Sequence, residues 1–301
     1  MAQFKIMIDT GSDMPQSFID EHDLTVIPLP FTLDDVQHVN GRWQEISATE
    51  FYDALGSGSL ASTALVNPES FLQEFTEYAE RGEELLVITL SGGLSGTFQN
   101  SRIALEEIKG KYPDCGIYTI DSANASGGTG LLIYLAVKKR AEGLSIAETY
   151  EWLEANKQKC ISLFTVDDLM FLHRGGRLSK LSAVAGSIIG IKPVLNVAPD
   201  GTLKLKDKVR GRKGAIEKLL SQMKRTLNPG TELDTVLIIH SNCAAEAESL
   251  ADMIKSEIKV RDIMIDMMGP VIGAHVGPGT IALFFEGDMD RDEYESKFYS
   301  K

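Results

Sequence analysis

The stretch Leu86-Val87-Ile88-Thr89-Leu90-Ser91-Gly92-Gly93-Leu94-Ser95-Gly96-Thr97 joins an apolar run to a turn of small and hydroxyl residues. The apolar run is short and β-branched, which predicts a buried strand. Backbone N–H groups and hydroxyls converge at a turn of this kind, and the arrangement suits a carboxylate or a phosphate, although many such turns bind no ligand. Apolar residues then recur at helical spacing, at Ile103, Ala104, Leu105 and Ile108. The stretch therefore predicts a strand, a candidate anion-binding turn and a helix in succession.

The motifs of three enzyme classes are incomplete in this chain. The segment 93–97 lacks the last glycine of the serine-hydrolase elbow, and no Gly-Lys-Ser/Thr follows it as a Walker loop requires. Asp9-Thr10-Gly11-Ser12 matches the aspartic-protease motif. A single-chain protease of that class carries the motif twice because two carboxylates must face each other, and here it occurs once. The turn at 91–97 is therefore expected to hold a ligand rather than to attack it.

The composition narrows the choice of partners and compartment. The chain has 301 residues and a formal net charge of −13, which argues against nucleic acid as a partner. No apolar run reaches the length of a membrane span, and the first residues lack the apolar core of a signal peptide. The three cysteines, Cys115, Cys160 and Cys243, are scattered and form no C-x-x-C motif, which indicates reduced thiols. We therefore expect a cytoplasmic protein.

Before residue 160, predicted strands alternate with predicted helices, as is typical of a parallel α/β sheet. Loops rich in Ser, Thr, Gly and Asp follow the predicted strands at 4–9, 24–29, 87–90 and 117–120. The carboxyl ends of parallel strands lie along one edge of a sheet, where ligands bind. The polar loops are therefore expected to lie close together.

After Cys160 the pattern changes, and we place a domain boundary near residue 160. Short helices are predicted near 167–172 and 182–189, followed by a hairpin whose turn is Pro199-Asp200-Gly201. Three further segments are expected to be exposed or irregular: the lysines at 204, 206 and 208, a loop at 273–279, and an acidic tail at 288–292.

Several motifs, taken together and in this order, resemble the DegV family of bacterial fatty-acid-binding proteins that serve fatty acid kinase. They lie at 9–13, at Thr63 with 67–71, and at 95–97, 121–122, 174–179, 210–213 and 275–279. The resemblance runs nearly end to end. It implies two α/β domains, 1–160 with a mostly parallel sheet and 161–301 with a mixed sheet, and a ligand tunnel between them.

The resemblance also implies the residues that bind the ligand. Carried over by position, Thr63, Ser95 and the Gly96 amide hold the carboxylate of a long-chain fatty acid, and His275 completes the network. The remaining two residues of interest, Arg177 and Arg210, are expected near the mouth of the tunnel, for phosphate transfer or kinase docking.

The implied partner is a separate kinase subunit, which holds ATP and Mg²⁺ and phosphorylates the carboxylate to an acyl phosphate. On this interpretation the chain carries no catalytic residue, no metal and no cofactor, and it makes transient contact with a membrane surface. Two other functions fit the same residues. One is an acyl hydrolase or transferase with Ser95 as nucleophile and His275 as base, and the other is a lipid-sensing protein without a kinase partner.

Overall fold

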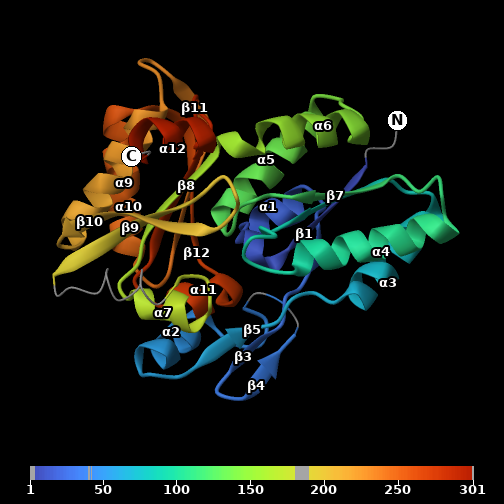
Figure 1. Ribbon diagram of the computed structural model, residues 1–301, viewed down its shortest axis with the longest axis horizontal. Coiled ribbons are helices and arrows are strands. Elements are labelled where there is room, and N and C mark those ends of the chain that lie inside the picture. Colours follow the sequence, from blue (N-terminus) through green and yellow to red (C-terminus); the bar gives the residue numbers. More distant parts are fainter. Residues whose placement is uncertain (1–3, 40, 42, 180–189, 300–301) are drawn as a thin grey trace.

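The computed structural model describes residues 4–39, 41, 43–179 and 190–299 (Figure 1). Its first sheet is parallel, with the strand order β2-β1-β6-β7. The predicted mostly parallel sheet is confirmed, and its strands end at one edge, where the polar loops follow. The strands are β1 (Lys5–Asp9), β2 (Thr25–Ile27), β6 (Leu85–Thr89) and β7 (Ile117–Asp121).

Helices cover both faces of the parallel sheet (Figure 1). Met7 and Val87 belong to the core cluster with α3 and α4, and their neighbours Ile8 and Ile88 belong to the cluster with α5 and α6. Strands buried on both faces read as continuous apolar runs, and this explains the run that precedes the turn at 91–97. The helices are α1 (Gln16–Glu21), α3 (Pro68–Arg81), α4 (Thr97–Lys111), α5 (Gly127–Ala141) and α6 (Ile146–Asn156).

The second sheet is mixed, as expected, with the strand order β10-β9-β8-β13-β11-β12. Only β11 and β12 pair in parallel, and the predicted hairpin is β9 with β10. Helices α9 (Arg212–Thr226) and α10 (Ala244–Glu257) cover one face. The strands are β8 (Cys160–Thr165), β9 (Ile191–Val197), β10 (Leu203–Arg210), β11 (Glu232–His240), β12 (Lys259–Met267) and β13 (Ile281–Glu286).

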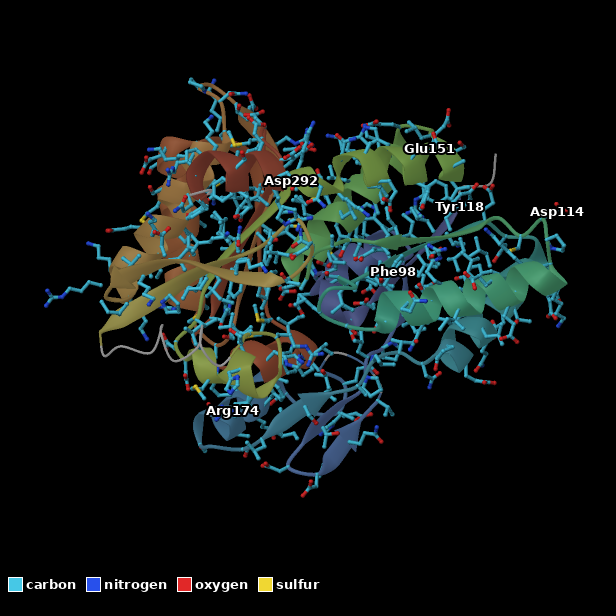
Figure 2. The ribbon with its side chains drawn as sticks, in the orientation of Figure 1. Phe98, Asp114, Tyr118, Glu151, Arg174 and Asp292 are labelled. Atoms are coloured by element: carbon cyan, nitrogen blue, oxygen red, sulfur yellow. The ribbon has the colours of Figure 1, made fainter. Side chains whose placement is uncertain are left out.

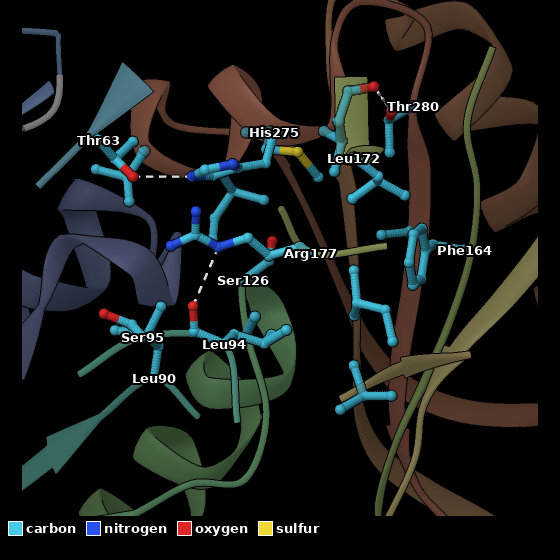
Figure 3. A pocket seen from close by; sticks show the side chains of 18 of the residues that line it. Thr63, Leu90, Leu94, Ser95, Ser126, Phe164, Leu172, Arg177, His275 and Thr280 are labelled. Carbon is cyan, nitrogen blue, oxygen red and sulfur yellow. Dashed lines mark hydrogen bonds between the residues drawn. The ribbon is translucent and has the colours of Figure 1, made fainter. Parts of the chain in front are cut away.

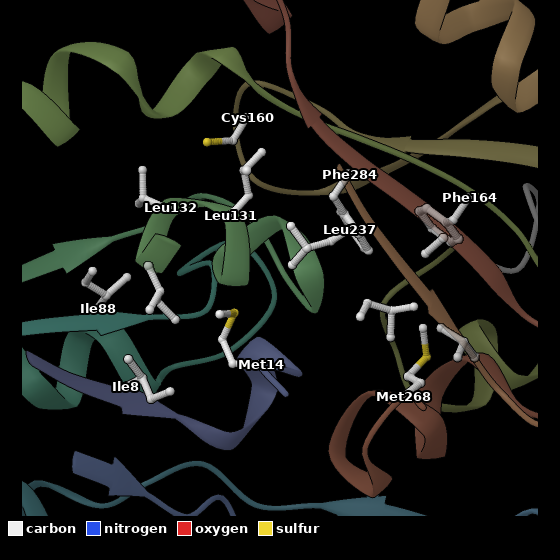
Figure 4. Packing of buried hydrophobic residues seen from close by; sticks show 14 of the residues in the cluster. Ile8, Met14, Ile88, Leu131, Leu132, Cys160, Phe164, Leu237, Met268 and Phe284 are labelled. Carbon is white, nitrogen blue, oxygen red and sulfur yellow. The ribbon is translucent and has the colours of Figure 1, made fainter. Parts of the chain in front are cut away.

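Helix α5 packs between the two large sheets. It contacts β6 of the parallel sheet as well as β8, β11 and β13 of the mixed sheet. Its glycines permit a close approach, because a Cβ on Gly127 would lie 2.5 Å from Cδ2 of Phe284 and one on Gly128 would lie 2.5 Å from Oγ of Ser162. One core cluster therefore extends across both halves of the chain (Figure 4). The division into two domains at residue 160 stays a prediction.

A small third sheet, which the sequence analysis did not predict, has the order β4-β3-β5. It comprises β3 (Phe31–Leu33), β4 (Val36–His38) and β5 (Ala61–Thr63), strands too short to show a periodic pattern. Helix α2 (Ala48–Gly56) begins at a capping box between Ser47 and Glu50. Helices α7 (Leu169–Arg174) and α11 (Pro270–Val276) lie between this sheet and the mixed sheet (Figure 1).

Several sequence expectations were wrong. Residues 270–276 form α11 rather than a loop, and the expected acidic tail leads into α12 (Arg291–Tyr299). Arg291 is 1% exposed, and its Nη1 donates to the carbonyls of Ala123 at 2.6 Å and Ala198 at 3.2 Å. The register shifts between Leu205 and Asp207, so Lys206 turns inward and pairs with Glu295. The helix predicted at 182–189 lies outside the described residues.

Two short 3-10 helices, η1 (Thr10–Ser12) and η2 (Lys157–Lys159), complete the described fold. Within the described ranges, no helix combines the length and the apolar character that crossing a bilayer requires.

The close packing of α5 predicts opposite effects for two glycine-to-alanine changes in helices. Gly127→Ala should destabilise the protein by about 1–3 kcal/mol, because its methyl group overlaps the Phe284 ring. Gly110→Ala in α4 should stabilise it by about 0.5–1 kcal/mol, because no atom lies within 4 Å of the added methyl and alanine favours the helix. Urea unfolding measures both changes. A Gly127→Ala protein as stable as the parent would contradict the packing argument.

Candidate functional site

A pocket lies where the loops of the parallel sheet face the mixed sheet. Polar side chains gather on one wall, where Thr63, Ser95, Arg177 and His275 lie together (Figure 3). None of the described residues that line it is acidic. The rest of the lining is mainly apolar: Leu29, Leu90, Leu94, Ala125, Phe164, Leu172, Val197, Leu203, Met268, Val271, Ile272, Val276, Ala282 and Phe284.

The turn after β6 supplies the Ser95 hydroxyl and the Leu94 carbonyl to the pocket, and the N–H groups of residues 92–95 bond inside the protein. The Gly92 N–H donates to Asp121 and the Gly93 N–H to the hydroxyl of Ser91. The Leu94 and Ser95 N–H groups donate to the carbonyl of Ser91. Because these donors are used inside the protein, the turn presents the Ser95 side chain to the pocket instead.

The carboxylates of the string Asp9-Thr10-Gly11-Ser12-Asp13 position the loops around the pocket. Asp9 accepts hydrogen bonds from the N–H groups of Gly11 at 2.8 Å and Leu90 at 2.7 Å, which joins the ends of β1 and β6. Burial raises its pKa to about 7. Asp13 accepts from the Gly269 N–H at 2.8 Å, where α11 begins. The protease-like string therefore has a structural role.

His275 reaches the pocket from the last turn of α11 and meets Thr63 at the end of β5. Its Nε2 lies 2.8 Å from the Thr63 Oγ1 (Figure 3). Burial, together with the Arg177 cation, lowers the pKa of His275 to about 4, so the imidazole is neutral at pH 7. Gly175 makes room for the ring, because a Cβ there would lie 2.1 Å from its Nδ1. The first glycine of the Arg-Gly-Gly-Arg motif is therefore a steric requirement of His275.

Arg177 brings a cation into the pocket wall. Its Nε donates to the Leu94 carbonyl at 3.1 Å and its Nη1 to the Gly175 carbonyl at 2.5 Å. Burial lowers its pKa, and no ion pair joins it to a carboxylate among the residues that the structure describes. Both bonds are to neutral groups, so the charge of the guanidinium is not compensated. Burying such a charge costs free energy that an anionic ligand would offset.

A second, more polar groove lies on the outer side of the same wall. It shares Thr63, Arg177 and His275 with the main pocket. It adds Arg174 of α7 together with Ser59 before β5 and Ser62 within it. Arg174 extends from α7 toward the side that carries the small sheet (Figure 2). The Thr63–His275 pair therefore separates the apolar pocket from a groove that contains arginine.

The structure brings four of the six predicted site residues to one pocket. Gly96 is not part of its lining and packs instead against Leu65, whose Cδ2 would lie 3.2 Å from an added Cβ. Arg210 is exposed at the end of β10 and is not part of the pocket lining. The roles assigned to these residues stay predictions.

Two hydroxyl residues of the lining were missed at the sequence level. Ser126 donates to Asp13 at 2.6 Å, and Thr280 donates to the carbonyl of Val276 at 3.2 Å. Thr280 directly follows the loop predicted at 273–279, and Ser126 begins the glycine-rich stretch 126–130; these positions were the available signal.

The geometry does not assemble a hydrolase. The Ser95 hydroxyl bonds to Thr97 at 3.0 Å, whereas His275 bonds to Thr63. The Nδ1 of His275, which an orienting carboxylate would have to bind, is buried against Gly175 with no hydrogen-bond partner among the described residues. Among the residues that the structure describes, no three His, Cys, Asp or Glu side chains lie close enough together to bind a metal ion.

Known proteins resemble this chain over nearly its whole length. Residues 3–288 match the family described as "Uncharacterised protein, DegV family". A DegV domain-containing protein of Clostridium perfringens is 40% identical over 289 residues, which is 96% of this chain and 99% of that protein.

Two solved structures share the fold. A Thermotoga maritima protein, described as revealing a fatty acid binding function, superposes with a TM-score of 0.83 at 29% identity, over 95% of this chain and 100% of its own. The fatty acid kinase B3 protein of Streptococcus pneumoniae, loaded with linoleic acid, has a TM-score of 0.81 at 22% identity, over 95% of this chain and 100% of its own. The second likeness shows a common fold.

The lowered pKa of His275 predicts a dependence of stability on pH. The pKa is about 4 in the folded protein against 6.5 ordinarily, so the unfolded chain takes up the proton first as the pH falls. The stabilisation is complete above pH 6.5 and is lost as the pH falls toward 4. Relative to a His275→Asn variant, the parent should lose about 2–3 kcal/mol of unfolding free energy across that range. Urea unfolding at several pH values measures the difference, and a difference that does not change with pH would show that the assignment is wrong.

Proposed function

The chain belongs to the DegV family, and from this membership and the geometry of its pocket we propose that it binds a long-chain fatty acid and presents the carboxylate to a separate kinase subunit. The proposal has two parts. The first is the binding of the acid, and the second is the transfer of a phosphoryl group to it. Each part rests on different features of the site.

The Arg177 guanidinium carries the first part of the proposal. It is a half-buried cation beside an apolar pocket, and its two hydrogen bonds there are to carbonyls. A carboxylate next to it gains a charge-assisted hydrogen bond and compensates the charge. Thr63 and Ser95 add hydroxyls on the same wall. A monoanion with a short polar head therefore fits this wall.

The apolar lining supports a long acyl chain as the remainder of the ligand. Each buried methylene contributes roughly 0.8 kcal/mol, so a long chain supplies most of the affinity while the head group sets the orientation. The Thermotoga maritima protein of the same fold is described as binding fatty acid. A small carboxylic acid would leave most of the apolar wall unoccupied.

The outer groove supports phosphoryl transfer as the second part. A carboxylate held at the shared wall lies next to a groove that contains Arg174, so a phosphoryl donor can approach from outside. A carboxylate oxygen then attacks the terminal phosphorus of ATP, the bond to ADP breaks, and an acyl phosphate forms. ATP and Mg²⁺ belong to the partner subunit in this proposal.

Exposed basic residues on an acidic chain support the docking of a partner. The net charge is −13, yet Arg210 and Lys213 are exposed at the end of β10 and the start of α9. A lipid-sensing protein without a kinase would use the same pocket but would not need the outer groove. The groove therefore favours the carrier over the sensor.

Mass spectrometry of the purified protein tests the class of ligand. An organic extract should contain an intact free fatty acid in an amount close to that of the protein. Digestion of the same sample should show Ser95 without an acyl group. An acyl-Ser95 adduct would support the hydrolase or transferase instead, and an extract free of fatty acid, from a protein that also fails to bind added oleic acid, would end the proposal.

Replacing two arginines should separate acid binding from docking. Arg177→Met should weaken the binding of oleic acid by about ten- to a hundredfold, because a hydrogen bond to a charged group is lost. Arg210→Ala should leave this affinity unchanged and slow the formation of acyl phosphate by the kinase. Calorimetry and a kinase assay measure the two effects.

Thermal melting of the ligand-free variants is the control for both. If Arg177→Met binds oleic acid as the parent does and slows only the kinase step, Arg177 acts in transfer, as the sequence analysis expected, and its assignment to the carboxylate is wrong.

A further inference from the structure

We propose that Ala282 determines the length of acyl chain that the pocket accepts. This inference rests on the proposed function and concerns the wall opposite the polar cluster. Ala282 lies on β13, lines the pocket and is 3% exposed. It is a specificity-determining residue, and it does not touch the reacting atoms.

The strand register places Ala282 among larger side chains. Its cross-strand partners are Phe164 on β8 and Ile239 on β11. Directly opposite residues share one face of a sheet, and so do residues two positions apart on a strand, which adds Phe284. Alanine is the smallest of these four side chains. The apolar wall therefore has a hollow at position 282.

The hollow lies on the wall that faces the polar cluster. Phe164, the neighbour of Ala282, lies across the pocket from Arg177, Leu94 and Ser95 (Figure 3). An acyl chain held by its carboxylate at the polar wall reaches this side with its last carbons. The depth available to those carbons is set by the side chain at the hollow.

The surroundings of the hollow are stiff. The Phe284 ring packs directly on Gly127, where a Cβ would lie 2.5 Å from it, and Ile239 Cγ1 would lie 3.0 Å from the same Cβ. Phe284 and Leu237 are packed between α5 and the mixed sheet (Figure 4). These side chains have no space into which to withdraw, so added volume at position 282 is taken from the pocket.

The test is a profile of affinities for saturated fatty acids, from lauric to arachidic acid, measured by calorimetry. Ala282→Val and Ala282→Leu should shift the preferred acid progressively toward shorter chains. Each methylene forced out of the pocket should lower the affinity about fourfold. The shorter acids should bind the variants as they bind the parent. Phe164→Leu should shift the profile in the opposite direction.

A matched pair of variants separates this effect from crowding of a core. Ala247 on α10 is equally buried but belongs to the core cluster on the other face of the mixed sheet, away from the pocket. Ala247→Val and Ala247→Leu should lower the melting temperature and leave the order of affinities unchanged.

The outcomes distinguish this inference from the proposed function. If the parent binds none of these acids, the proposed function is wrong and the inference is wrong with it. If the parent binds them and the Ala282 and Phe164 variants keep its order of affinities, only the inference is overturned. An equal shift in the Ala247 variants would also overturn it, because the effect would then not arise in the pocket.

Discussion

The structure depends on helix α5 being packed from both sides. From Leu131 to Val137 the helix is apolar around its circumference, and such a segment is stable in water only when it is buried on every face. The parallel sheet covers one side and the mixed sheet the other, and the glycines at its first turn allow the contact. The loops at the carboxyl edge of the parallel sheet are thereby held against an apolar sheet face. The pocket between them follows from this arrangement.

Charge is distributed differently inside the pocket and outside it. The chain as a whole is strongly acidic, whereas the polar wall holds an arginine with neutral partners and a histidine that burial keeps uncharged. An unpaired buried cation lowers stability, and proteins keep such a group where a ligand completes it. The carboxylates of Asp9 and Asp13, by contrast, have backbone N–H partners in the loops. Their hydrogen bonds hold the loops in place, whereas Arg177 has no carboxylate partner among the described residues.

The sequence predicted the elements whose signals are local. The turn Pro199-Asp200-Gly201 predicted the hairpin of β9 and β10, because turns act over a few residues. Prediction from the sequence failed where contacts between residues far apart along the chain determine the structure. Helix α11 contains Gly273 and begins where Asp13 bonds to Gly269. The N–H groups of residues 92–95 in the turn after β6 bond to Ser91 and Asp121. The position of Arg177 in the pocket wall, where it bonds to Leu94, also follows from tertiary packing.

The contacts that close the pocket join residues very far apart along the chain. Thr63 and His275 are 212 positions apart, Asp13 and Gly269 are 256 apart, and Arg291 bonds to Ala123 across 168. Contacts of this kind carry the largest loop-closure entropy and slow folding. We therefore expect the pocket to be completed late in folding. Until then its apolar walls are exposed to other chains, which favours aggregation of folding intermediates. A ligand that binds only the completed pocket stabilises the folded protein and so lowers the population of these intermediates.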